Sequence, residues 1–223
     1  NITAISCSNW LKNRAAESSL FQKFNNISIP NPINILTFKP LNQSDLREKY
    51  QLKSDKKYLV VVAAKLEVYW KGFSYLIETV NQLPPEYCLL IVGQIEPETL
   101  KLIKIETKAF GSIHDESTMA EIYNLADAFV TSSLFENLPN TIMEALACGV
   151  PCVGFKTGGI PEMIQHQENG YLAELKNCED LRLGIEWVFE NKSELKVNAR
   201  NFAIENYDQK KIADKIIKLY QQS

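Results

Sequence analysis

The chain has 223 residues, a formal net charge of −3 at pH 7 and a hydrophobic content of 45%. This length fits one large domain or at most two small ones, with enough residues to bury a core. The slightly acidic balance argues against nucleic acid as the main partner, because phosphate binding requires a basic surface. No apolar run approaches the roughly 20 residues of a membrane-spanning helix, and residues 1–10 lack the basic region and long apolar core expected of a signal peptide.

The predicted elements start with a short strand at 2–6 and a helix at 9–21. From Tyr58 onward, apolar runs typical of strands alternate with amphipathic stretches typical of helices. The run YLVVVAA (58–64) is of the kind found in buried parallel strands. This alternation predicts an α/β fold, a Rossmann-like parallel sheet with helices on both faces. Later strands are expected at 87–93, 108–110, 126–132, 152–155 and 170–173, and helices at 72–83, 96–106, 115–125, 179–190, 192–206 and 209–221.

The five cysteines are an odd number and lack the spacing of a metal site. Cys88 and Cys152 fall in apolar runs and are expected to be small core residues. The sequence therefore favours a reducing cytoplasm over a disulfide framework. There is no cluster of metal ligands and no Asp-x-Asp motif, so neither a metal nor another cofactor is expected.

The stretch from Thr131 to Glu162 carries the strongest functional signal. It reads as a strand end, a loop with Glu136, a helix from about Pro139, a glycine stop at Gly149, a second strand and a glycine loop. Glu144 then lies about one and a half turns inside the helix. In an open α/β sheet, ligands bind at the mouth of such a strand-to-helix turn.

Glu136 and Glu144 enclose seven residues, and the segments ENLP, EALACGVP and GGIPE surround them. With these motifs the chain resembles the C-terminal, donor-binding half of a retaining glycosyltransferase with the GT-B fold, of glycosyltransferase family 4. The paired-glutamate motif alone is weak, but the prolines and glycines in register around it make the pattern specific. The resemblance implies transfer of a sugar from a nucleotide-diphosphate sugar to an acceptor such as a glycan or lipid-linked saccharide, in bacterial cell-surface polysaccharide biosynthesis.

The resemblance also implies a domain organisation. Residues 1–223 would be one nucleotide-sugar-binding domain, with residues 1–40 as the segment that arrives from a missing N-terminal acceptor domain. The expected partners are therefore the nucleotide-sugar and that acceptor domain. The expected location is the cytoplasm, with contact to the inner face of the membrane only peripheral and only through the missing half. The isolated domain is expected to bind the donor and to turn over little of it.

Two alternatives stay open. A nucleotide-sugar epimerase of the same fold is one, although the ENLP and EALACG segments argue against it. The other is a non-catalytic nucleotide-sugar-binding subunit that needs a partner chain. An acceptor-lobe sequence of ~150 residues or more upstream of Asn1 would favour the enzyme, whereas a native start codon there would favour the subunit.

The two motif glutamates have assigned roles under this resemblance. Glu144 would bind the ribose diol, because a carboxylate can accept from two adjacent hydroxyls, and otherwise it is a solvated helix residue. Glu136 would contact hydroxyls of the transferred sugar, and otherwise it caps the following helix. Asn137 and Leu138 would present backbone N–H groups to an anion at the start of that helix.

Lys65 and Lys71 are the candidates for the donor diphosphate. The family shows Gly-Arg-Leu, three residues and then Lys-Gly, whereas this chain has Ala-Lys-Leu, four residues and then Lys71-Gly72. Lys71 matches well, but Lys65 replaces an arginine and lacks its bidentate fork. With Glu136 these lysines form the expected catalytic set, and otherwise both are ordinary surface residues.

The remaining donor-binding candidates are backbone and apolar positions. Phe110 and Gly111 would form the wall against which the base lies, although Phe110 could equally be a core residue. Gly93 would allow the backbone to approach the ligand, unless it is a plain strand-end glycine. Gly159, in the loop before Pro161, resembles the glycine loop on the donor side of the family's site.

Overall fold

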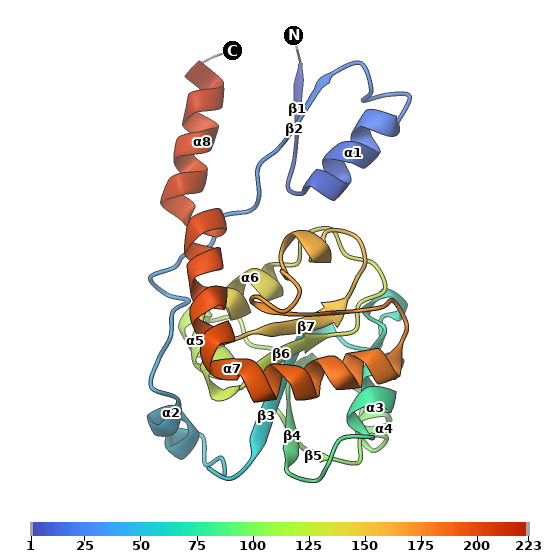
Figure 1. The fold of residues 1–223 in the computed structure, drawn as a ribbon, viewed down its shortest axis with the longest axis vertical. Helices are drawn as coiled ribbons and strands as arrows, with labels where there is room; N and C mark the ends of the chain where they lie inside the picture. The colour runs from blue at the N-terminus through green and yellow to red at the C-terminus, as the bar shows by residue number, and fades with distance from the viewer. Residues whose placement is uncertain (1, 222–223) are drawn as a thin grey trace.

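The computed structural model describes residues 2–221, and its centre is a parallel sheet of six strands (Figure 1). The strands are β3 (Lys57–Lys65), β4 (Tyr87–Gln94), β5 (Glu106–Ala109), β6 (Ala128–Thr131), β7 (Cys152–Phe155) and β8 (Gly170–Ala173). They lie in the order β5-β4-β3-β6-β7-β8, and every neighbouring pair is parallel. The chain moves outward in one direction from β3 and in the other from β6. The strand order therefore reverses between β3 and β6.

Helices cover both faces of the sheet (Figure 1). They are α5 (Glu116–Leu125) and α6 (Asn140–Ala147) on one face, and α3 (Phe73–Val80) and the first half of α7 (Cys178–Tyr207) on the other. Successive side chains of β3 show why two layers form, since Tyr58 and Val60 join the first core while Leu59 and Val61 join the second. The fold class expected from the sequence is confirmed.

Short helical segments connect these layers. The segment α2 (Gln43–Lys49) packs against α5, and α4 (Pro97–Leu100) follows β4. Two 3₁₀ turns, η1 (Tyr69–Lys71) and η2 (Ile160–Glu162), follow β3 and β7. Both turns therefore lie at the carboxyl-end edge of the sheet, where they can contribute to a site.

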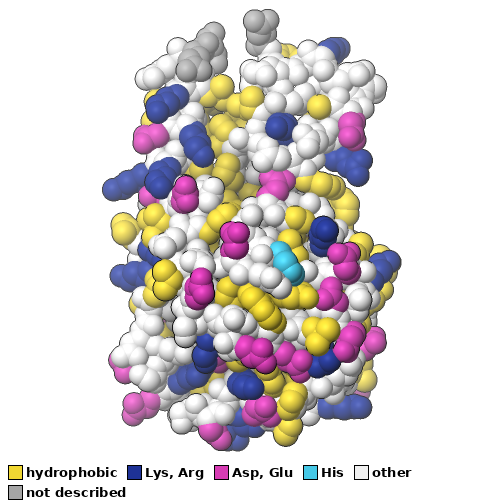
Figure 2. Space-filling view, in the orientation of Figure 1, with side chains coloured by type: hydrophobic (Ala, Val, Ile, Leu, Met, Phe, Trp, Pro, Cys, Tyr) yellow, Lys and Arg dark blue, Asp and Glu magenta, His cyan; other side chains and the backbone are white. Residues whose placement is uncertain are grey.

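Two parts of the chain project beyond the body of the domain (Figure 1). One is a small unit of β1 (Thr3–Ser6), α1 (Asn9–Glu17) and β2 (Asn25–Ser28), in which the two strands pair in parallel. The other is α8 (Gln209–Gln221). Hydrophobic side chains line the furrow between the two projections (Figure 2).

Three predictions of element boundaries were wrong. The helix expected through residue 21 ends at Glu17, because Ser18 adopts an extended backbone. The helix expected over 96–106 is only α4, since Glu106 leaves the helical pattern and pairs with Cys88 in the sheet. The two helices expected over 179–190 and 192–206 are one helix, α7, which bends as it leaves the sheet (Figure 1). Residue 191, where the sequence analysis placed the break between the two helices, is neither glycine nor proline.

The cysteines follow the sequence-based expectation. All five are free thiols, and Cys88 and Cys152 are buried in β4 and β7. Burial raises the pKa of the Cys88 thiol to about 11, so it stays protonated at neutral pH. Within residues 2–221, no helix has the length and apolar composition needed to cross a bilayer.

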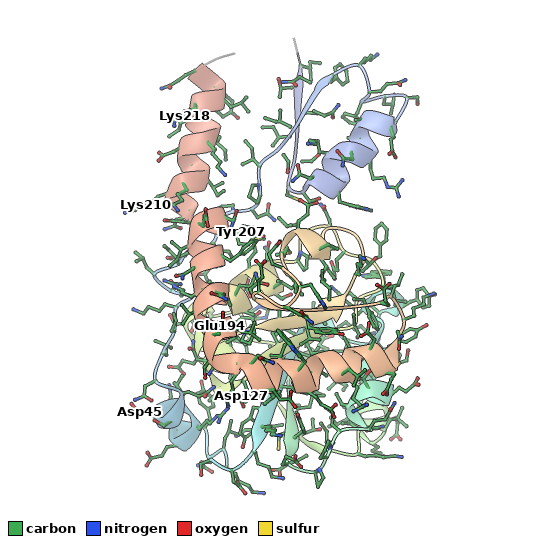
Figure 3. The ribbon with its side chains drawn as sticks, viewed as in Figure 1. Asp45, Asp127, Glu194, Tyr207, Lys210 and Lys218 are labelled. Atoms are coloured by element: carbon green, nitrogen blue, oxygen red, sulfur yellow. The ribbon has the colours of Figure 1, made fainter. Side chains whose placement is uncertain are left out.

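Asp127 joins four elements at the amino end of β6 (Figure 3). Its side chain is 3% exposed, and its Oδ2 accepts from the Arg47 guanidinium at 2.8 Å and from the Tyr58 N–H at 3.0 Å. Its Oδ1 lies 3.3 Å from the Lys192 ammonium. Arg47 also donates to the Leu125 carbonyl. One buried carboxylate thus ties α2 and α7 to β3 and β6.

We predict that Asp127→Ala lowers the free energy of unfolding by ~3 kcal/mol or more, because it leaves a largely buried arginine without its counter-charge. The measurement is urea denaturation at pH 7. Glu194→Ala, at an exposed position of α7 (Figure 3), is the control and should change the free energy by less than ~0.5 kcal/mol. Equal midpoints for the two variants would contradict the anchoring role.

Candidate functional site

A cleft of about 620 Å³ opens at the carboxyl ends of β3 and β4. It adjoins the place where the strand order reverses, which is where open α/β sheets bind ligands. Its volume lies within the range of small-molecule sites. Its walls come from the ends of the two strands, from the segment after β5 and from α5 and α6, and they include Val62, Ala63, Lys65, Gly93, Ser112, Ile113, His114, Glu116 and Glu144.

A second, smaller recess adjoins this cleft. Lys71, Ser133 and Glu136 line it, and the two hollows share Val62 and Ala63 of β3. The two motif glutamates therefore open on neighbouring hollows, one from the wall of α6 and one from the loop after β6.

Glu144 is a largely buried carboxylate with one hydrogen bond from the protein. Its Oε2 accepts from the Tyr123 hydroxyl at 2.7 Å. Burial raises the pKa of Glu144, the Tyr123 hydrogen bond opposes this, and the charge of Glu116 adds to it. The pKa of Tyr123 is held well above its usual value, mainly by burial, so its proton stays in place as a donor. Among the described residues, Oε1 of Glu144 has no donor and can accept from a ligand.

Glu136 is part of an ion pair inside the smaller recess. Its Oε1 accepts from the Lys71 ammonium and, at 3.0 Å, from the Ser133 hydroxyl. The Lys71 and Glu136 side chains are 30% and 17% exposed. The sequence predicted both residues for the site but not that they meet.

Contacts between η1 and the loop after β6 produce this meeting. The Ser132 hydroxyl donates to the Lys71 carbonyl at 3.0 Å, and the Leu134 N–H donates to the Trp70 carbonyl at 2.8 Å. Gly72 has φ +59°, and a Cβ there would lie 2.1 Å from the Ser132 carbonyl oxygen. Only glycine allows η1 to lie this close to the loop.

The glycine loop after β7 (residues 157–159) packs against the backbone of the loop that carries Glu136. A Cβ on Gly158, whose φ is +55°, would lie 1.8 Å from the Glu136 carbonyl oxygen, and one on Gly159 would lie 1.8 Å from that of Asn137. The Gly159 N–H donates to the Glu136 carbonyl at 3.1 Å, and the Thr157 hydroxyl donates to the Leu134 carbonyl. Gly159, predicted to bind the donor, lies behind the loop and does not line either hollow.

Lys65 and Gly93 both line the larger cleft, as the sequence predicted for residues at the ends of these strands. Lys65 is exposed and, within residues 2–221, has no ion-pair partner. Gly93 has φ +121°, and a Cβ there would lie 1.6 Å from the Ala63 carbonyl oxygen. The glycine therefore permits the irregular pairing by which β3 and β4 reach the cleft.

Phe110 and Gly111 lie at the edge of this arrangement. The Phe110 ring packs edge-on against Tyr50, with ring centres 5.9 Å apart. The Gly111 carbonyl accepts from the Gly93 N–H at 2.8 Å. Neither residue lines the cleft, which is bordered instead by the next three residues, ending at His114.

Asn137 and Leu138 have structural contacts of their own. The Asn137 amide accepts from the Ser8 hydroxyl and donates to the Cys7 sulfur at 2.9 Å. The Leu138 side chain is buried in the core. The helix α6 begins one residue later than expected, at Asn140, so any anion-binding role of 137 and 138 is left to their backbone.

Sequence reasoning missed Ser133, Glu116 and the backbone of 112–113. Ser133 had a readable signal, because it lies between the strand end and Glu136. Glu116 had none beyond its place in the first turn of α5. In the part of the chain that the structure describes, no three His, Cys, Asp or Glu side chains are grouped to hold a metal ion.

The sequence matches a known protein family over most of its length. The profile of the family described as glycosyl transferases group 1 matches residues 42–205, which include the smaller recess and all of the larger cleft except Phe38. The chain belongs to this family. A group 1 relative is N,N'-diacetylbacillosaminyl-diphospho-undecaprenol alpha-1,3-N-acetylgalactosaminyltransferase of Campylobacter jejuni, 30% identical over 197 residues, 84% of this chain and 52% of the relative. The chain thus spans about half the length of the curated relatives it matches.

Solved structures share the fold of this group 1 domain, and they are GT-B glycosyltransferases. Alr3699/HepE of Anabaena, in complex with UDP and glucose, has a TM-score of 0.83 at 20% identity, covering 98% of this chain and 63% of that one. The C-terminal domain of a glycosyl transferase group 1 family protein from Francisella tularensis has a TM-score of 0.67 at 20% identity. That match covers 79% of this chain and 99% of the domain.

We predict that Gly158→Ala destabilises the group 1 domain much more than Gly111→Ala. Both glycines have positive φ, but a Cβ on Gly158 would overlap the Glu136 carbonyl, whereas a Cβ on Gly111 would meet open space. Gly111→Ala should cost only the ~1 kcal/mol of an unfavourable backbone region. Thermal unfolding of both variants measures the difference. Similar losses for the two would show that the overlap is relieved without cost.

We predict that Glu144→Gln becomes the more stable form as pH rises. A carboxyl whose pKa is higher in the folded chain than in the unfolded one destabilises the fold when ionised. This cost is absent below the usual value of 4.5 and grows as pH rises through the raised value. Glutamine keeps an acceptor for the Tyr123 hydroxyl without the charge. Melting temperatures from pH 4 to pH 7 test this, and a difference that does not change with pH would contradict it.

Proposed function

We propose that this chain is the donor-binding half of a retaining glycosyltransferase of family 4, which holds a nucleotide-diphosphate sugar across the two hollows. The observation that carries the proposal is the shared wall at Val62 and Ala63, which places the hollows of Glu144 and Glu136 side by side. A nucleotide-sugar is long and has chemically different ends. Two adjoining subsites with different electrostatics fit such a molecule.

The larger cleft takes the nucleoside. Glu144 accepts from the ribose diol, for which a buried carboxylate with one free oxygen is suited. The backbone of residues 112–114, which follows Phe110 and Gly111, forms the wall for the base. Gly93 lets the backbone come close to the ligand. Support comes from the Anabaena neighbour, which is described in complex with UDP and glucose.

The smaller recess encloses only about 10 Å³, so the sugar lies at its mouth, beside Glu136, and lysines flank the diphosphate between the two ends. The charge of the nearby Glu67 acts on Lys65, but Lys65 lines the cleft and forms no ion pair within residues 2–221, so its ammonium can approach a phosphate. Lys71 already pairs with Glu136, which places its ammonium beside the carboxylate that holds the sugar hydroxyls. As the bond to the sugar breaks, the two ammonium groups stabilise the charge that grows on the leaving diphosphate. Backbone N–H groups at Asn137 and Leu138 contribute to the same anion.

The acceptor enters from a domain upstream of residue 1, for which residues 1–40 are the incoming segment. Support comes from the Francisella domain, which is described as C-terminal and is covered almost completely. The acceptor is a glycan or a lipid-linked saccharide, as the name of the Campylobacter relative suggests. The sugar is transferred with retention by attack on the face from which the diphosphate leaves. The reaction takes place on the cytoplasmic side, without a metal.

A thermal-shift panel of UDP-, GDP-, ADP- and TDP-sugars tests the proposal. The sugars of one nucleotide should raise the melting temperature clearly more than those of the other three. EDTA should leave this shift unchanged. Absence of a shift with all four would overturn nucleotide-sugar binding, and loss of the shift in EDTA would overturn the metal-free site.

We predict that Glu144→Ala weakens binding of the selected nucleotide diphosphate by about tenfold or more, because a charge-assisted hydrogen bond to the diol is worth ~1.5 kcal/mol or more. Titration calorimetry measures the affinity. Glu194→Ala, far from the cleft on α7, is the matched control and should bind as the wild type does. Unchanged affinity of the Glu144 variant would remove the ribose assignment.

A further inference from the structure

The start of α1 is capped by a residue far along the chain. An α-helix leaves its first N–H groups without intrahelical acceptors. In α1, the Glu162 carboxylate accepts from the Asn9 N–H at 2.8 Å and from the Trp10 N–H at 2.6 Å. The Leu11 N–H is satisfied by the Ser8 hydroxyl at 3.0 Å. The sequence explains the Ser8 cap, but the fold brings Glu162 to it across more than 150 residues.

This cap matters because α1 is short and exposed. The helix has nine residues and none of them is buried. Isolated helices of this length are marginal in water. The negative carboxylate at its N-terminus satisfies two donors and complements the helix dipole. Glu162 is therefore the main side-chain link between the β1–α1–β2 unit and the η2 turn.

The same unit also touches both neighbours of Glu136. The Trp10 ring packs edge-on against Phe135, with ring centres 5.2 Å apart. The Ser8 hydroxyl donates to the Asn137 amide oxygen. Glu136 lies between these two contacts.

A third path runs from the cap through the glycine loop. Glu162 follows Gly159 by three residues, and the Gly159 N–H donates to the Glu136 carbonyl at 3.1 Å. The glycine loop and the loop after β6 are thus in direct backbone contact. A displacement of α1 would therefore reach Glu136 by two paths. One runs through its sequence neighbours Phe135 and Asn137, and the other runs through the glycine loop.

We infer that Glu162 is a positioning residue: by capping α1 it couples the placement of the β1–α1–β2 unit to the placement of the Glu136 carboxylate. The inference rests on the proposed function, in which Glu136 contacts the donor sugar. The unit projects from the domain (Figure 1), so whatever binds it gains a direct connection to the sugar subsite and not to the ribose subsite.

Amide hydrogen exchange, followed by NMR on the unliganded chain, tests the coupling without any ligand. In Glu162→Ala, exchange should accelerate about fivefold or more at the Asn9 and Trp10 amides, as expected for a lost cap, and also in the loop 134–138. The α5 amides are the internal reference and should not change. Faster exchange in α1 alone would show a local cap and overturn the coupling. Glu162→Gln keeps one acceptor and should give an intermediate effect, which serves if the alanine variant does not fold.

Calorimetry with UDP and UDP-glucose, or the corresponding pair when the panel selects another base, tests the consequence for the site. Glu162→Ala should weaken UDP-glucose binding about threefold or more, the size of one weakened hydrogen bond, while UDP binding stays within about twofold. Equal losses for both ligands would indicate a general structural defect and overturn the positioning role. Glu168→Ala, an exposed glutamate in the turn after η2, is the matched control and should affect neither ligand.

A double-mutant cycle separates positioning from independent contact. If Glu162 acts through Glu136, Glu162→Ala should have no further effect on UDP-glucose binding in a Glu136→Gln background. Additive losses would overturn the inference. Absence of nucleotide binding by the wild-type chain would instead overturn the proposed function, and the exchange data would still decide whether α1 and the loop are coupled.

Discussion

The attachment of η1 to the loop after β6 determines where chemistry can take place in this domain. The Ser132 hydroxyl and the Leu134 N–H both bind carbonyls of η1, and Gly72 removes the side chain that would keep the two segments apart. Because β3 and β6 are neighbours at the reversal of strand order, this contact brings Lys71 to Glu136. The smaller recess and its position beside the larger cleft follow from that single junction.

Much of the fold could be predicted because its signals are local. The strands β3 and β4 are continuous apolar runs, and the turn at Gly149 has the glycine that a helix end favours. The helix that carries Glu144 was also predicted from the local sequence, to within one residue of its start. Local reading placed Glu136 and Glu144 on the right elements, and the order of the sheet placed those elements together.

The rest depends on partners that are remote in the sequence. The helix expected over 96–106 stops early, because Glu106 at its predicted end pairs with Cys88 of β4, and this pairing outweighs local preference. The Asn137 side chain accepts a hydrogen bond from Ser8, and no spacing rule connects these two residues. The sequence left open whether Phe110 is a core residue or a site residue. Its ring packs against Tyr50, a contact that the sequence does not reveal. Such pairings have no signature in a single sequence.

Gly158 and Gly159 lie against backbone carbonyls, so the restriction on them concerns the spacing of two loops and not the identity of a ligand. Under the proposed function, a descendant of this domain that no longer held a sugar would still need both glycines to fold. Lys65, which has no ion-pair partner in the described chain, would be under no such restriction. In a lineage that had abandoned catalysis, the first changes would therefore fall on the cleft wall while the glycine loop persisted. An intact glycine loop is evidence of ancestry, and the lysine is the better evidence of continued use.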